Sequence, residues 1–426
     1  MKIRELRSAG ALLTALASRQ LSAETVARAC LERIAELEPT VHAFAHLDPD
    51  RVLAEARELD HGPVRGPLHG LPLGIKDVMD TNDMPTAYGS PIYAGHRPAA
   101  DAAVVSVARS RGALIFGKTV TTEFACFPPG PTANPRNPAH TPGGSSSGSA
   151  AAVAGGMLPA ALGTQTAGSV IRPAAFCGVV GYKPTYGTLP RVGVKMISDT
   201  LDTVGLFANS VADVALVCAA LSGRQALRVA DRLAAPKLAV CLTPQWPMAE
   251  PETKDLFEKL PEKISKAGAR CGTRSLPATF DGLEAAHAPV WEYEMARCLA
   301  DEHRRHRDRI REPLRSQLER GWTIAPERYD AAAKLARDCR AALADALDGI
   351  DALVVPSARG EAPKGLEVTG DPVFNRIWTL LHAPAVQVPL GTGPNGLPLG
   401  VQLVGRIGDD ARVLAAAAWL EQTLAK

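Results

Sequence analysis

The segment from Thr141 to Pro184 constrains the fold more than any other part of the chain. Between Ser145 and Lys183 its only Asp, Glu, Lys or Arg is Arg172, and glycine, serine and alanine dominate the rest. A flexible Gly/Ser linker has polar neighbours, whereas this tract runs directly into AAAV at 150–153. The segment therefore predicts a buried helix that opens from a serine-rich turn.

The composition limits the classes of function. The chain has 426 residues, of which 46% are hydrophobic and only 5% aromatic, so we expect a large core of small and aliphatic side chains. Lys and Arg number 47 against 45 Asp and Glu. This balance gives no field that would attract nucleic acid or an anionic membrane. Length alone leaves the number of domains open.

The cysteines and the start of the chain set further limits. Eight cysteines are scattered singly without a C-x-x-C pair, which favours reduced, buried thiols over a zinc or redox site. The first residues, MKIRELRSAG, lack the apolar core of a signal peptide, and the longest uncharged stretch is broken by Gly, Pro, Ser and Thr. We therefore expect a cytoplasmic protein with no membrane partner and no bound metal.

Apolar strands and amphipathic helices alternate along the chain, which predicts an α/β fold. The run LHGLPLGIKD at 68–77 indicates a strand that ends at Lys76, and 113–116 indicates a second buried strand. Residues 134–142 read as a proline-rich loop. The basic run DEHRRHRDRIREPLR at 301–315 is more typical of a solvated helix face than of an anion site.

Two motifs point to other functions and fail on their surroundings. GALIFGKT at 112–119 has the spacing of a nucleotide-binding P-loop, but its apolar centre predicts a strand that cannot wrap a phosphate. GSSSG at 144–148 has the spacing of a hydrolase nucleophile elbow around Ser146. That elbow must follow a strand, and the loop NPRNPAHTPG precedes this one. A P-loop nucleotide-binding protein remains the alternative from a different class.

A serine nucleophile with a lysine base accounts for more of these residues. A serine hydroxyl must pass its proton to a base within hydrogen-bond reach. His69 and His140 lie nearest to the motifs, and neither is clearly placed as a base. Lys76 at the end of a buried strand is the better candidate, because desolvation disfavours the ammonium and supplies a neutral amine. An exposed lysine in a turn is the structural alternative.

Segments on both sides of these residues resemble the amidase signature family. The resemblance is carried by GPLHGLPLGIKD at 66–77, NPRNPAHTPGGSSSGSAAAVAGG at 134–156, GTQTAGSVIRPAAFCGVVGYKPTYG at 163–187 and shorter matches at 117–125, 198–215, 351–356 and 396–405. It implies one domain over 1–426, built on a large mixed, twisted sheet of about eleven strands with helices on both faces. Only about 224–346 is weakly covered, and we expect it to be a charged helical region at the pocket rim or a subunit contact.

The resemblance also assigns roles, residue by residue. Ser169 matches the nucleophile, Lys76 the base, and Ser145, on a cis peptide bond, the serine that relays the proton between them. The backbone amides of Thr166, Ala167, Gly168 and Ser169 would form the oxyanion site that tetrahedral chemistry requires.

Other positions in the segment raise questions of specificity. Arg172 follows Ser169 by three residues, so a helical turn would place both on one face. There the guanidinium could clamp a substrate carboxylate or serve as a wall. Ser146 would support the relay. Gln165 and Ala167 replace a frequent Asp and a usual Gly, and the former weakens any role for a carboxylate in orienting the nucleophile loop.

The resemblance implies an amidohydrolase that cleaves a small carboxylic amide to an acid and ammonia or an amine through an acyl-enzyme, without a cofactor. The sequence around Ser169 is most similar to small bacterial amidases, which indicates a short carboxylated amide such as malonamate. We expect a small-molecule substrate, no direct contact with nucleic acid and, by resemblance only, a homodimer. The alternative within the family is the amidase subunit of a tRNA-dependent amidotransferase.

Overall fold

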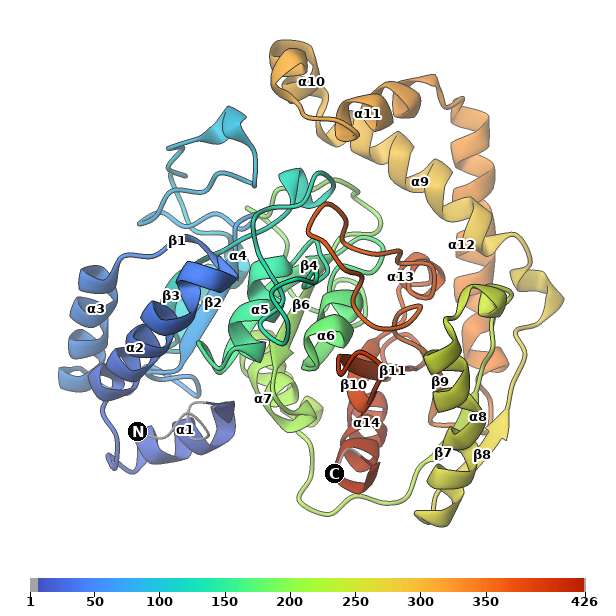
Figure 1. Ribbon diagram of the computed structural model, residues 1–426, viewed down its shortest axis with the longest axis horizontal. Coiled ribbons are helices and arrows are strands. Elements are labelled where there is room, and N and C mark those ends of the chain that lie inside the picture. Colours follow the sequence, from blue (N-terminus) through green and yellow to red (C-terminus); the bar gives the residue numbers. More distant parts are fainter. Residues whose placement is uncertain (1–6, 425–426) are drawn as a thin grey trace.

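One mixed sheet runs through the molecule (Figure 1). The computed structural model describes residues 7–424. Among them, eleven strands lie in the order β1-β3-β2-β4-β6-β5-β10-β11-β9-β7-β8. Their bounds are β1 Phe44–His46, β2 Pro72–Lys76, β3 Leu114–Thr119, β4 Ala160–Gln165, β5 Val180–Lys183, β6 Thr203–Ala208, β7 Lys237–Val240, β8 Arg270–Thr273, β9 Ala352–Pro356, β10 Ala385–Thr392 and β11 Pro398–Val404. The predicted α/β fold with about eleven strands is confirmed.

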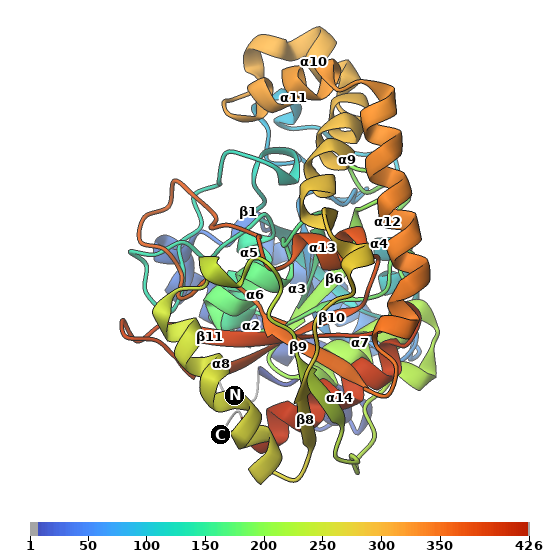
Figure 2. The ribbon, with the colours of Figure 1, turned by 90° about the vertical axis from the view of Figure 1, so that its right-hand side faces the viewer.

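Helices cover both faces of the sheet, as Figure 2 shows. α5 and α6 pack on one face, and α7 and α14 pack on the other. The helix bounds are α1 Ala9–Ala17, α2 Ala23–Val41, α3 Pro49–His61, α4 Ala103–Ser110, α5 Ser147–Ala154, α6 Ile171–Cys177, α7 Val211–Ser222, α8 Pro251–Lys266, α9 Leu283–Cys298, α10 Ala300–His306, α11 Leu314–Thr323, α12 Pro326–Ala346, α13 Arg376–Leu380 and α14 Asp410–Leu424.

The segment 141–184 is buried almost throughout. Only Ala167 and Gly178 in it are partly exposed. It contains α5, β4, α6 and β5, so its small residues allow two helices and two strands to pack closely. Gly181 shows this directly, because a Cβ there would lie 2.6 Å from the Cβ of Ala174 in α6.

α5 is fixed over the ends of neighbouring strands. The Gly148 amide donates to the Val120 carbonyl at 3.0 Å, and a Cβ at 148 would lie 2.1 Å from the Ala43 carbonyl oxygen. The Ser149 hydroxyl lies 2.7 Å from that of Thr119 and donates to the Leu162 carbonyl at 2.8 Å. Ser149 therefore binds α5 to β3 and β4, rather than facing water.

The two rejected motifs have the structures that their surroundings predict. Residues 114–119 of the P-loop-like run are β3, which is buried along its whole length, and Lys118 donates to the Met79 carbonyl at 2.6 Å and to the Thr86 hydroxyl at 2.5 Å. Ser146 follows a loop and precedes α5, so it does not stand on the strand-to-helix turn of a nucleophile elbow.

The charged region 224–346 contributes to the sheet and extends beyond it. β7 and β8 form one edge of the sheet, and α9 to α12 project from the body of the molecule (Figure 2). In the basic run, Arg304 and Arg305 pair with Asp301, and Arg307 pairs with Glu319. The arginines of the run are therefore largely exposed and ion-paired, as predicted, whereas Glu302 is buried and Arg311 pairs with the buried Glu123.

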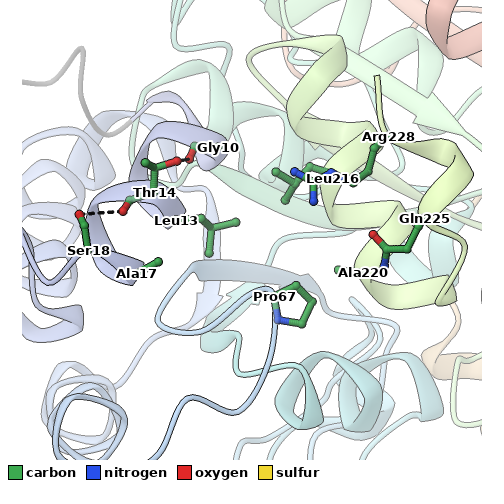
Figure 3. Close-up of a pocket in the computed structure, with 10 residues that line it drawn as sticks. All are labelled: Gly10, Leu13, Thr14, Ala17, Ser18, Pro67, Leu216, Ala220, Gln225 and Arg228. Atoms are coloured by element: carbon green, nitrogen blue, oxygen red, sulfur yellow. Dashed lines mark hydrogen bonds between the residues drawn. The ribbon is translucent and has the colours of Figure 1, made fainter. Parts of the chain in front are cut away.

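One surface cavity lies between α1, α7 and the turn at Pro67 (Figure 3). Its Thr14 and Ser18 hydroxyls donate to carbonyls of their own helix, and none of the predicted site residues lines it. Within residues 7–424, no helix is long and apolar enough to cross a membrane. The same residues contain no group of three or more His, Cys, Asp or Glu side chains placed to hold a metal ion.

Candidate active site

Lys76 ends β2 with its side chain fully buried. Its Nζ lies 2.8 Å from Oγ of Ser145 and 2.8 Å from Oγ1 of Thr164. Ser145 is in the turn before α5, and Thr164 is in β4, which pairs in parallel with β2. Sheet register and the α5 turn thus bring together groups that are 69 and 88 positions from Lys76.

Burial changes the chemistry of this amine. It lowers the pKa of Lys76 from about 10.5 to about 7, and the nearby carboxylate of Asp202 opposes the shift. A neutral amine has two N–H groups and a lone pair, so it can donate to Thr164 and accept from the Ser145 hydroxyl. The arrangement can therefore take a proton from Ser145 near neutral pH.

The turn that carries Ser145 and Ser146 contains a cis peptide bond and is hydrogen-bonded to the main chain of Thr164. The Gly144–Ser145 peptide bond is cis, as the resemblance implies, and Gly143 has a φ of 80°, which favours glycine. The Ser146 hydroxyl donates to the Thr164 carbonyl at 3.2 Å and accepts from the Thr164 amide at 3.3 Å. Its link to the Lys76–Ser145 pair is therefore indirect, through Thr164.

Ser169 lies in the turn between β4 and α6 and is 8% exposed. Gln165 anchors this turn: its Oε1 accepts the amides of Val170 at 2.9 Å and Ile171 at 3.0 Å. Its Nε2 donates to the Thr379 hydroxyl at 2.9 Å. The amide oxygen of Gln165 thus binds the first N–H groups at the start of α6. The turn is therefore anchored although residue 165 is not an aspartate.

The amides assigned to the oxyanion site are free to bind a ligand. In the described part of the chain, the N–H groups of residues 166–169 donate to no protein acceptor. Two carbonyls of the same turn are occupied, because Thr379 Oγ1 donates to the Ala167 oxygen at 2.8 Å and the Arg172 amide donates to the Gly168 oxygen at 2.9 Å. The turn can therefore present several N–H groups to a developing oxyanion.

Asp202 binds the turn that carries Ser169 and acts on Lys76 through its charge. Its carboxylate accepts the Thr166 hydroxyl and the amides of Ile197 at 2.7 Å and Ser198 at 3.1 Å. Burial raises the pKa of Asp202 to about 6, while these hydrogen bonds oppose the shift. The negative charge of the ionised carboxylate favours the protonated form of Lys76.

Arg172 lies in the first turn of α6 and is only 4% exposed. Its Nη2 donates to the Gly144 carbonyl at 2.7 Å and to the Thr369 hydroxyl at 3.1 Å. Within residues 7–424 its Nε and Nη1 have no hydrogen-bond partner. Burial lowers its pKa to about 9, so the group is still a cation at neutral pH. Arg172 therefore supports the turn at Gly144 and retains donors for an anion.

Comparison with known proteins identifies the family. The family model described as Amidase matches residues 25–414. The chain belongs to the amidase signature family. A solved structure described as an amidase superposes with a TM-score of 0.89 at 30% identity, covering 98% of this chain and 100% of that one. The protein is accordingly a hydrolase of amide C–N bonds.

Two curated relatives are named as a subunit of glutamyl-tRNA(Gln) amidotransferase. The one from Koribacter versatilis is 31% identical over 472 residues, covering 96% of this chain and 97% of its own. The one from Chloroflexus aggregans is 35% identical over 465 residues, covering 94% and 93%. Both alignments thus span nearly the full length of this amidase and of its relatives.

These relatives correct one expectation. A small-molecule substrate, no direct contact with nucleic acid and a possible homodimer were expected. Each relative is instead one subunit of an enzyme named for glutamyl-tRNA, which agrees with the stated alternative. The expectation is wrong because a net charge near zero argues only against a strongly basic surface on this chain. The net charge carries no information on whether the chain works with other subunits.

Thr164, Asp202 and Thr379 contact the site and were missed from the sequence. Thr164 and Asp202 lie in segments that carry the family resemblance. Each is a polar residue at one end of a buried strand, and this pattern could have indicated them as site residues. Thr379 lies in α13, more than 200 positions after the turn that it contacts. No local pattern indicates such a contact.

The pH dependence of amide cleavage is expected to report the pKa of Lys76. A lysine that accepts the proton must be neutral, so kcat/KM is expected to rise with pH through a midpoint of about 7 and to be lost as the pH falls. Asp202→Asn removes a charge that raises this pKa. Its midpoint is therefore expected at lower pH, with a lower plateau because the anchor of Thr166 changes.

The control for this measurement is Asp213→Asn, which alters a buried carboxylate that binds the Gly10 amide away from the site. Its midpoint is expected to match that of the unaltered enzyme. A midpoint that stays in place or rises in Asp202→Asn would contradict the assignment to Lys76.

Proposed function

We propose that this amidase is the ammonia-releasing component of an amidotransferase and that it cleaves a short, carboxylate-bearing amide through an acyl-enzyme on Ser169. The observation that carries the chemistry is the buried contact of Lys76 Nζ with Ser145 Oγ at 2.8 Å. Lys76 also contacts Thr164, two residues before the turn with free amides. The assignment to an assembly is supported by relatives that match over 93% and 97% of their own length.

In the proposed cycle, Ser169 Oγ attacks the amide carbon while its proton passes through Ser145 to neutral Lys76. The amides of 166–169 bind the oxyanion, and one such donor typically contributes about 3 kcal/mol to the transition state. Lys76 then returns the proton through Ser145 to the leaving nitrogen as the C–N bond breaks. Water next attacks the acyl carbon by the same relay, which releases the acid and restores Ser169.

The proposed substrate class follows from Arg172. A buried guanidinium with unpartnered N–H groups is costly unless an anion binds it. A carboxylate can accept two of its N–H groups at once. Since Arg172 follows Ser169 by three residues, a short amide such as malonamate, asparagine or glutamine would place its amide at the nucleophile and its carboxylate at the guanidinium.

The acyl-enzyme is tested by trapping with hydroxylamine. With malonamate and hydroxylamine, the enzyme is expected to form the hydroxamate, because the added nucleophile intercepts the ester on Ser169. Ser169→Ala is expected to lose at least about 10³-fold in turnover and to form no hydroxamate. Ser222→Ala, whose hydroxyl bonds the Cys218 carbonyl and the Arg224 amide at the end of α7, away from the site, is the control and should match the parent. Hydroxamate formation by Ser169→Ala at the parent rate would exclude the assignment.

The role of Arg172 is tested by a ratio of substrates. We compare kcat/KM for malonamate and for propionamide, which lacks the carboxylate. Arg172→Met is expected to lower the ratio by about 10- to 100-fold, since a hydrogen bond to a charged group typically contributes about 1.5–3 kcal/mol. Any disturbance of the Gly144 turn affects both substrates and cancels in the ratio. An unchanged ratio would reduce Arg172 to a structural role.

The assembly is tested by affinity purification of a tagged chain from its native cells. Further subunits are expected to elute with it, and the eluate should convert glutamyl-tRNA to its amide when an amide donor is supplied. Ser169→Ala should elute with the same subunits and require free ammonium in place of the donor. Elution of the chain alone, with full amide hydrolysis, would contradict the proposed assembly.

A further inference from the structure

His287 connects a distant helix to the nucleophile turn. It lies in α9, in the charged region that the family resemblance covers weakly, and is 1% exposed. Its Nε2 is 3.1 Å from the carbonyl oxygen of Thr166. Because a carbonyl oxygen can only accept, Nε2 must carry the hydrogen, and this contact fixes the tautomer of the ring.

The contact acts on a peptide group of the oxyanion turn. The Thr166 carbonyl and the Ala167 N–H belong to one planar unit. In a trans peptide these two bonds point in opposite directions, and the Thr166–Ala167 bond is not among the cis bonds of the described chain. A donor that holds the carbonyl from behind therefore directs the Ala167 N–H to the other side of the turn.

The next peptide unit is held in the same way. Thr379 Oγ1 donates to the Ala167 carbonyl at 2.8 Å, and this unit carries the Gly168 N–H. Two side chains from α9 and α13 thus orient consecutive amides, neither of which donates to a protein acceptor in the described part of the chain. The arrangement matches the requirement of an oxyanion site for donors fixed before charge develops.

We propose that His287 is a positioning residue for catalysis, which holds the Thr166 carbonyl so that the Ala167 N–H faces the oxyanion formed at Ser169. This inference rests on the proposed acyl-enzyme chemistry. His287 contacts neither substrate nor the reacting atoms in this role, and it exchanges no proton with them.

The protonation state of the His287 ring and the anchoring of α9 both suit a hydrogen-bond donor that stays in place. Burial lowers the pKa of His287 to about 4, and the charge of Arg376 adds to the effect. The ring therefore stays neutral across the range in which Lys76 titrates. α9 is itself anchored two turns further on, where Glu294 accepts the Thr200 amide at 3.0 Å and the Thr200 hydroxyl at 2.7 Å.

The test compares His287→Phe, which fills the site without a donor, with His287→Gln, whose side-chain amide can donate to the same carbonyl. kcat and KM for malonamate are measured with the full chain, together with inhibition by propylboronic acid, which forms a tetrahedral adduct on a serine hydroxyl. His69→Phe is the matched control, because His69 makes an equal 3.1 Å contact with the Leu59 carbonyl away from the site.

In His287→Phe, kcat is expected to fall about 10- to 100-fold with KM little changed. The affinity for propylboronic acid should fall by a similar factor, and the pH midpoint near 7 should not move. His287→Gln should recover most of the loss, and His69→Phe should show none. Thr379→Val, which removes the neighbouring contact, should lower the same two quantities.

Two outcomes would overturn the role of His287. One is full kcat and full boronate affinity in His287→Phe. The other is a loss of kcat and boronate affinity in His287→Gln as large as that in His287→Phe, with the loss in each variant following its drop in melting temperature. If His287→Phe does not fold, His287→Leu takes its place under the same criteria. Failure of the proposed function itself is distinct, because the unaltered enzyme would then form no hydroxamate.

Discussion

A lysine amine enclosed at the end of a strand is the interaction on which the site depends. The pKa of Lys76 falls from about 10.5 to about 7 because burial removes water from the ammonium. A shift of this size corresponds to roughly 5 kcal/mol in favour of the neutral form. Contacts with Ser145 and Thr164 replace the lost water. The dense packing of 141–184 maintains this burial. The Gly, Ser and Ala composition that allows such packing therefore also keeps the basicity of Lys76 low.

The sheet supplies the geometry for that arrangement. β2 and β4 are parallel neighbours, so Lys76 and Gln165 lie at the same edge, where the carboxyl ends of strands open towards α5 and α6. From there the turn to α6 carries Ser169. Side chains then fix the turn from three directions: Gln165 binds the first amides at α6, Asp202 binds the Thr166 hydroxyl, and Thr379 binds the Ala167 carbonyl. His287 adds a fourth contact from a helix outside the sheet.

The α/β class, the strand ending at Lys76, the buried 141–184 segment and the solvated basic run could all be predicted from the sequence. Each is a local property, expressed in periodicity or in composition over a few residues. β8 was not distinguished from the charged helical region around it, because an edge strand with mostly exposed side chains has no apolar alternation. The partner expectation was wrong, although the amidotransferase subunit stood as the alternative, since the net charge of one chain does not report its partners.

The sequence by itself determined the chemistry that is available to this protein: a lysine at a strand end, serines in a small-residue turn and an arginine one helical turn after the nucleophile candidate. Only the tertiary structure decided how these groups act. The neutral state of Lys76, the free N–H groups of 166–169 and the unpartnered nitrogens of Arg172 all depend on which atoms surround them. Asp202, His287 and Thr379 reach the turn across 36, 121 and 212 positions. Contacts over such separations leave no periodic signal, because they arise when whole helices and strands pack together.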